Sequence, residues 1–228
     1  MAINTTSFTN TPQAGDDFFA AAGTGLTEDS SATVYLAVMA NDLGGAAKTL
    51  WSIDDGTNSS GTSSPTDLLI QDTARIETTS ADHSAHGAHI WITTDGRVGY
   101  DSATLSTEFK DQLQHLAAGQ FLTDTFTYAI RLGNGTLSWA TATVQIVGVN
   151  DAPVVSGAVT GSALEDGSSV TLDALANASD VDAGAVLKVT NLRPHCHPAS
   201  RTTSRLIPSS STRRIRPSSI WRQAITRW

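Results

Sequence analysis

An alternating pattern between residues 126 and 146 constrains the fold more than any other feature of the sequence. Apolar residues fill every second position on both sides of Gly133-Asn134-Gly135: Phe126, Tyr128, Ile130, and then Ala140, Ala142, Val144 and Ile146. Such alternation places apolar side chains on one face of a strand. Asn-Gly supplies the positive φ angles that tight hairpins need. The segment therefore predicts a β-hairpin with one buried face.

Other segments carry the same strand signal, and helical periodicity is almost absent. Strands are expected at residues 32–38, 88–93, 98–100 and 168–173. The exception is 107–118, where Phe109, Leu113 and Leu116 recur at helical spacing before Gly119, which predicts one or two helical turns. Short strands separated by clusters of Gly, Asn, Asp and Ser predict an all-β fold, an antiparallel β-sandwich.

An internal similarity and a punctuated segment predict the domain organisation. Residues 26–42 (LTEDSSATVYLAVMAND) resemble residues 163–179 (ALEDGSSVTLDALANAS), with Glu28-Asp29 matching Glu165-Asp166 and Asn41 matching Asn177. Pro153, within GVNDAPVVSG, cannot continue a central strand. We expect a flexible segment at 1–25, a β-sandwich repeat at 26–149 with an insertion-like loop region at 56–89, a linker at 150–157, and the start of a second repeat at 158–192.

The last part of the chain, residues 193–228, has a different composition. Residues 1–192 hold all 22 acidic residues and six basic ones, whereas 193–228 hold eight arginines. The codons that residues 215–228 allow, read one nucleotide out of register, permit FQHLAAGDHAV, which contains the QHLAAG of 114–119. We therefore predict that the repeat array is truncated by a frameshift and that the tail is disordered. A functional Arg-rich arm is the alternative, although the tail lacks helical period and aromatic spacing.

The acidic composition of residues 1–192 narrows the classes of partner. Few basic residues argue against nucleic acid or an anionic membrane as partner, whereas divalent cations suit an acidic surface. Cys196 is the only cysteine, which excludes a disulfide framework. No run approaches the roughly 18 apolar residues of a spanning helix, so membrane insertion is not expected. Residues 1–30 show no signal-peptide pattern, and export would need a signal elsewhere.

Three segments carry a family resemblance: DGRVGYD (95–101), LQHLAAGQFLTDTFTYAI (113–130) and SWATATVQIVGVNDAPV (138–154). Together with the two ED…AN segments they resemble the VCBS and cadherin-like tandem repeats of large bacterial, RTX-type surface adhesins. The resemblance implies an Ig/cadherin-like β-sandwich and a non-enzymatic structural or adhesive role in an extracellular or cell-surface protein. Its partners would be neighbouring repeats, and surface glycans or other cells. The sequence departs from the family in its GNG turn, the 56–89 region and the short second repeat.

Acidic residues around the linker predict a calcium site. Calcium takes six to eight oxygen ligands, which carboxylates, amide oxygens and linker carbonyls supply together. Alternate residues of an extended Asp-x-Asp point to one side. The candidate ligands, arranged as the family resemblance implies, are Asn150, Asp151, Glu165, Asp166, Asp180 and Asp182. The alternative is that these residues are solvated turn formers.

Other patterns give weaker functional signals. His83, His86 and His89 would share a side only in a helix, and a polar loop before the strand at Ile90 is the favoured interpretation over a zinc site. No nucleophile elbow, zinc-protease motif or phosphate-binding loop occurs, so we predict no enzymatic activity. The alternatives left open are a carbohydrate-binding module that uses Trp51, Trp91 and Trp139, and a fragment of a secreted hydrolase.

Overall fold

The computed structural model describes residues 13–54, 67–164, 166–190 and 224–227. The chain consists mostly of β-strands in antiparallel-rich open sheets with few helices, which confirms the predicted all-β class. It divides into two compact units, residues 1–149 (unit 1) and 150–228 (unit 2). No helix among the described residues has the length and apolar character needed to cross a membrane.

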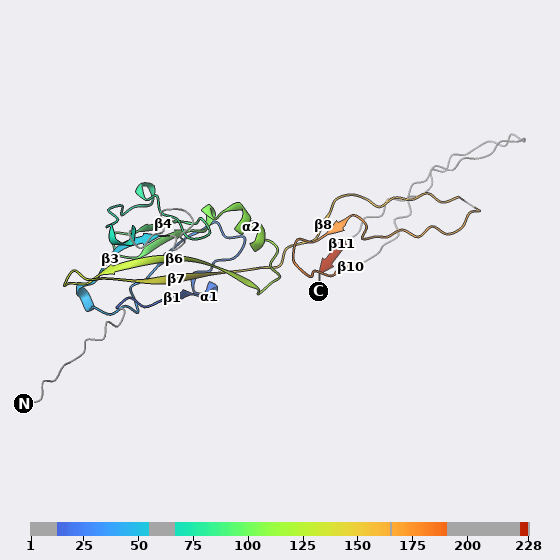
Figure 1. Cartoon of the computed structure of the whole chain (residues 1–228). Coiled ribbons are helices and arrows are strands. Elements are labelled where there is room, and N and C mark those ends of the chain that lie inside the picture. Colours follow the sequence, from blue (N-terminus) through green and yellow to red (C-terminus); the bar gives the residue numbers. More distant parts are fainter. Residues whose placement is uncertain (1–12, 55–66, 165, 191–223, 228) are drawn as a thin grey trace, which may run out of the picture. The chain divides into compact units, whose positions relative to one another are not determined.

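The predicted hairpin is the centre of a four-stranded sheet in unit 1, with the order β1-β7-β6-β3. Its strands are β1 (Asp17–Phe19), β3 (Thr49–Asp54), β6 (Phe121–Arg131) and β7 (Leu137–Val147). The hairpin pairs Phe126 with Ala142 and Tyr128 with Ala140, so its apolar residues share one face. Gly135 has a φ of 88°, the left-handed conformation expected in this turn. Strand β1 runs parallel to β7 along the outer edge (Figure 1).

A three-stranded antiparallel sheet with the order β2-β5-β4 forms the rest of the unit 1 framework. It comprises β2 (Thr33–Leu36), β4 (His89–Ile92) and β5 (Val98–Asp101), so the strands predicted at 32–38, 88–93 and 98–100 are confirmed. Trp91 pairs with Gly99, and a Cβ atom at residue 99 would lie only 2.2 Å from the Trp91 ring. Gly99 is therefore required by the packing of the indole.

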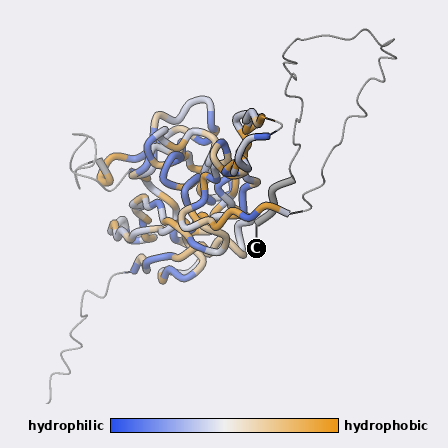
Figure 2. Tube along the Cα trace, turned by 90° about the vertical axis from the view of Figure 1, so that its right-hand side faces the viewer, coloured by the Kyte–Doolittle hydropathy of each residue, from blue (hydrophilic) through white to orange (hydrophobic). Residues whose placement is uncertain are grey.

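Both sheets of unit 1 contribute to a single hydrophobic core. Tyr100 and Ile90 enter it from one sheet, and Phe126 and Val144 from the other. Side chains alternate between the two faces of each strand, so one face of each sheet turns to the core. Figure 2 shows short hydrophobic and hydrophilic stretches following one another along the trace. Helix α2 (Thr107–Leu113) adds its apolar face to the same core. It begins at Thr107, as predicted, with the Ser106 side chain as its cap, and it ends earlier than the predicted residue 118.

Two regions predicted to be flexible or loop-like contain ordered elements in unit 1. Residues 13–25, expected to be flexible, include β1 and helix α1 (Ala21–Thr24). Strand β1 forms because it pairs with the edge of β7. The three residues of β1 carry too little pattern to predict this pairing from the sequence. The region 56–89 was predicted to be loop-like; its described part holds short 3₁₀ turns η2 (Asp67–Leu69) and η3 (Glu77–Thr79). Buried Leu68 accepts a hydrogen bond from Ser52 of β3, a strand that was not predicted. Two further 3₁₀ turns are η1 (Gly45–Ala47) and η4 (Ser102–Thr104).

Unit 2 has two short antiparallel pairs. Strand β8 (Val154–Val155) pairs with β9 (Ala178–Ser179), and β10 (Leu187–Thr190) pairs with β11 (Ala224–Arg227). Strand β8 lies inside the predicted linker. The strand predicted at 168–173 is wrong, because that segment is irregular and its apolar side chains are exposed. Strand β11 lies in the tail predicted to be disordered, where the edge of β10 supplies its partners; residues 193–223 and 228 lie outside the described chain.

Candidate metal centre

Three of the predicted metal ligands come together within unit 2. The backbone N–H of Asp151 donates to Asp182 Oδ2 at 3.2 Å, and the N–H of Asp182 donates to Asp180 Oδ1 at 3.1 Å. Asp182 is 4% exposed, which makes it a buried carboxylate. Asp180 Oδ2 is also buried and has no hydrogen-bond partner within the described part of the chain. This turn therefore concentrates acidic oxygens where water reaches them poorly.

The other predicted ligands occupy less informative positions. Asn150 uses its side-chain amide to donate to the backbone carbonyl of Asp151 at 2.8 Å. Asp166 is exposed in a turn. Glu165, predicted as a ligand on the strength of the repeat, lies outside the described residues.

Glu28 holds the C-terminal end of unit 1. Its backbone N–H donates to the carbonyl of Val147 at 3.0 Å, and its Oε1 accepts from the N–H of Val149 at 2.8 Å. Only 9% of its surface is exposed. The sequence-based ligand set omitted Glu28, although its match to Glu165 in the internal repeat was the signal that could have included it.

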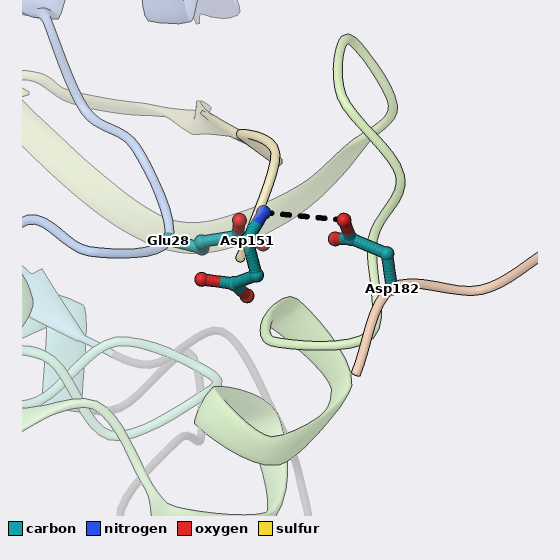
Figure 3. Close-up of side chains that lie close together, drawn as sticks. All are labelled: Glu28, Asp151 and Asp182. Carbon is teal, nitrogen blue, oxygen red and sulfur yellow. Dashed lines mark hydrogen bonds between the residues drawn. The ribbon is translucent and has the colours of Figure 1, made fainter. Parts of the chain in front are cut away.

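Asp151 and Asp182, both in unit 2, are acidic residues that could contribute to a metal site, and Figure 3 shows the Asp151 N–H donating to Asp182. Each residue offers a carboxylate oxygen, and oxygen ligands are those that hard cations such as calcium prefer. Buried carboxylates need compensation by hydrogen bonds or by positive charge. The orphaned Asp180 oxygen beside Asp182 has the same need. The residues present thus fit a calcium ion chemically.

Asp124 is a second buried carboxylate, and its environment is the opposite of an ion site. It lies on β6 and is 0% exposed. Its Oδ2 accepts from Tyr100 Oη at 2.7 Å and from Ser84 Oγ at 2.5 Å, and its Oδ1 accepts from the N–H groups of His86 and Thr125 at 3.0 and 2.8 Å. Four donors satisfy this carboxylate, and the pKa of Tyr100 is raised, first by burial and then by the Asp124 charge. Asp124 therefore has a structural role, which the sequence did not predict.

His83, His86 and His89 do not gather into one metal site. The rings of His83 and His89 lie 5.5 Å apart between centroids, whereas His86 stacks on Phe109 at 4.1 Å. His89 begins β4, and the two preceding histidines lie in the loop before it, as the favoured interpretation predicts.

A groove of about 620 Å³ opens on unit 1 beside β1 and β2. Phe18 and Tyr35 line it and are 61% and 52% exposed. Arg97 also lines the groove, with its guanidinium 5.1 Å from the centre of the Tyr35 ring and an ion pair to Asp95 at 2.8 Å. The groove thus presents two aromatic rings at an open edge of the unit.

No protein-family model matches the chain, and no curated protein matches it either.

Proposed function

We propose that the chain is a structural, adhesive tandem-repeat module of a bacterial extracellular or cell-surface protein, and that calcium stiffens the junction between its repeats. The VCBS and cadherin-like resemblance motivates the class. The β-sandwich architecture is part of the proposal, and the single core shared by two sheets of unit 1 supports it.

The observation that carries the proposal is a hydrogen-bond motif that occurs in both units. In unit 1 the side-chain amide of Asn41 donates to the carbonyls of residues 15 and 16 at 3.2 and 2.9 Å. In unit 2 the amide of Asn177 donates to the carbonyls of residues 157 and 158, at 3.3 Å each. Asn41 and Asn177 are the residues that the internal sequence match aligns. Each asparagine ties two successive carbonyls of an earlier segment to its own turn, which supports a common ancestry of the units.

Calcium has a specific mechanical role in this proposal. Glu28 holds Val149, the last residue of unit 1, and Asp151 is two residues further along the chain. An ion bound by Asp151, Asp180 and Asp182 of unit 2 would relieve the repulsion among their charges and restrict rotation about the residues between them. The fold buries the Asp182 carboxylate, and the Asp151 N–H holds this carboxylate in position by a hydrogen bond. The result is a rod-like array in place of a jointed chain.

Calcium titration of the full chain tests this role. We expect calorimetric binding that is at least tenfold weaker in D151N/D182N, and spin-label distance distributions across residue 150 that narrow with calcium only when both aspartates are present. D166N removes the same charge from an exposed position and serves as the matched control. Binding equal to wild type in the double variant, or calcium-independent distance distributions, would exclude the stiffening role.

The aromatic groove supports a carbohydrate-binding role as a second candidate. Exposed Phe18 and Tyr35 offer rings on which sugars stack, whereas Trp91 is 4% exposed and therefore unavailable. Arg131 lies over Trp51 at 5.0 Å, and Trp139 is 51% exposed. Glycan-array binding that is lost in Y35A and retained in W139A would favour this role; absence of any glycan signal would exclude it.

A further inference from the structure

The turn between β6 and β7 presents an asparagine in the pattern Asn-x-Thr. Asn134, Gly135 and Thr136 are all exposed, and they lie at the end of the long hairpin (Figure 1). Asn-x-Ser/Thr, with any residue except proline in the middle, is the sequon that enzymes read when they attach a sugar to asparagine. The turn therefore carries a complete sequon in a position that an enzyme can reach.

The hydrogen bonds of the turn fix the direction of the Asn134 side chain. Oδ1 of Asn134 accepts from the N–H of Thr136 at 3.0 Å. A backbone N–H faces the oxygen of a carboxamide, because the carboxamide nitrogen is itself a donor. The backbone closes the turn separately: the N–H of Gly135 donates to the carbonyl of Leu132, and the N–H of Leu132 donates to the carbonyl of Thr136, both at 2.9 Å. The oxygen of the carboxamide is thus held, and its nitrogen lies on the other side.

The side-chain nitrogen of Asn134 is free to react. Within the described part of the chain, Nδ2 of Asn134 makes no hydrogen bond. This nitrogen is the atom to which a sugar is joined in N-glycosylation. The hydrogen bond to Oδ1 draws electron density from the carboxamide, which makes the Nδ2 protons easier to remove. A sugar at this position displaces no contact of the fold.

A second asparagine in the same pattern has the opposite environment. Residues 177–179 read Asn-Ala-Ser and form another sequon. The side-chain nitrogen of Asn177 donates to the carbonyls of residues 157 and 158, at 3.3 Å each. A sugar attached there would displace the nitrogen from both carbonyls. The structure therefore separates two acceptors that the sequence pattern alone treats alike.

We propose that Asn134 is the acceptor of an N-linked sugar. A bond forms between Asn134 Nδ2 and the anomeric carbon of the sugar, while the bond between that carbon and a diphosphate oxygen breaks. The diphosphate leaves with the bonding electrons, and the proton lost by Nδ2 passes to a base of the transferase. The co-substrate is a sugar diphosphate carried by a nucleoside or by a lipid. This modification goes beyond the proposed adhesive role and does not depend on calcium.

The test uses the full chain in an N4Q/N58Q background, because Asn4 and Asn58 lie in sequons outside the described residues. S179T gives Asn177 the same third residue as Asn134. One arm supplies UDP-glucose and a soluble sequon-specific glycosyltransferase, and the other supplies a lipid-diphosphate oligosaccharide and a membrane oligosaccharyltransferase. Peptide mass mapping measures the sugar on each asparagine over time. Modification of Asn134 in either arm supports the proposal, and the arm identifies the carrier of the sugar.

The comparison of the two asparagines tests the structural argument. In the full chain we expect Asn134 to be modified about tenfold faster than Asn177, because two hydrogen bonds must break before the Asn177 nitrogen can react. Synthetic peptides of residues 130–138 and of residues 173–181 with S179T lack the two carbonyls and serve as the unfolded reference. Their rates should be similar.

Two variants separate modification from the structural role of the turn. N134Q removes the acceptor, whereas T136A keeps Asn134 and the backbone N–H at residue 136 but lacks the hydroxyl of the sequon. Both should lose the added sugar mass, and T136A should keep the thermal midpoint of the parent chain. Absence of sugar on Asn134 in both arms would overturn the proposal, as would equal rates at Asn134 and Asn177 in the full chain. Sugar mass retained in N134Q would place the modification on another residue and would likewise refute it.

Discussion

Replacement of Asp124 by alanine should destabilise unit 1 more than any other single loss of a polar group in its core. The carboxylate accepts from two hydroxyls and two backbone N–H groups, and it is completely buried. Each hydrogen bond to a charged group contributes about 1.5–3 kcal/mol. Each buried donor left without a partner costs about 1–3 kcal/mol. Removal of the buried charge offsets part of this loss, so we expect the free energy of unfolding to fall by about 3–5 kcal/mol.

Two smaller changes at the same network separate the contributions. Y100F removes one donor and leaves the carboxylate with three, and we expect a loss of about 1.5–3 kcal/mol. D124N keeps an oxygen for the two backbone N–H groups, while its amide faces hydroxyls that can turn to accept. We expect about 1–2 kcal/mol for this variant, which is below the loss in D124A.

Urea unfolding of the full chain, followed by tryptophan fluorescence, measures these differences. The buried ring of Trp91 reports on unit 1. The expected order of destabilisation is D124A, then Y100F, then D124N. A D124A variant within 1 kcal/mol of wild type, or a D124N variant as unstable as D124A, would refute the view that donor satisfaction makes Asp124 structural.

Three further changes test the fold of unit 1. Burial raises the pKa of Asp72 to about 6 from 3.8, so the folded state binds this proton more tightly than the unfolded state does. The free energy of unfolding should therefore fall as pH rises from about 4 to 6. In D72N this fall, measured by urea unfolding at each pH, should be smaller by about 1 kcal/mol. G99A should cost about 1–3 kcal/mol because the new Cβ overlaps the Trp91 ring, whereas G23A, which meets nothing within 4 Å, should be neutral or stabilising in the same thermal melts. S106A removes the cap of α2 and should cost about 1 kcal/mol; an unchanged denaturation midpoint would show that tertiary packing alone fixes the start of this helix.

Short-range patterns explain the sequence predictions that were confirmed. The hairpin of residues 126–146 combines a two-residue period with Asn-Gly, so both its strands and its turn are encoded locally. Helix α2 likewise has its cap and apolar spacing in one short segment. The strand expected at 168–173 failed because, among the described residues, its alternation has no paired strand, and Val170 and Leu172 are exposed. Strand β1 was missed because three residues carry little pattern, and its partners lie more than 120 residues away.

The metal-ligand candidates divide in the same way. Asn-Asp and Asp-x-Asp mark acidic turns by local spacing, and Asp151, Asp180 and Asp182 do come together within unit 2. Glu28 reaches Val149 only because unit 1 folds, a contact between residues 121 positions apart. No local motif marks such a meeting.

The sequence by itself determined the all-β class, the central hairpin, the helical turn at 107–113 and the acidic turns, because each depends on periodicity or turn chemistry within a few residues. Only the tertiary structure decided which polar groups meet in the core. Asp124 collects four donors, whereas the Tyr128 hydroxyl faces four acceptor oxygens, and both residues lie on β6 in alternating stretches that look alike in sequence. The difference arises from long-range packing, which assigns a satisfied structural carboxylate to one end of the strand and an oxygen-rich centre to the other.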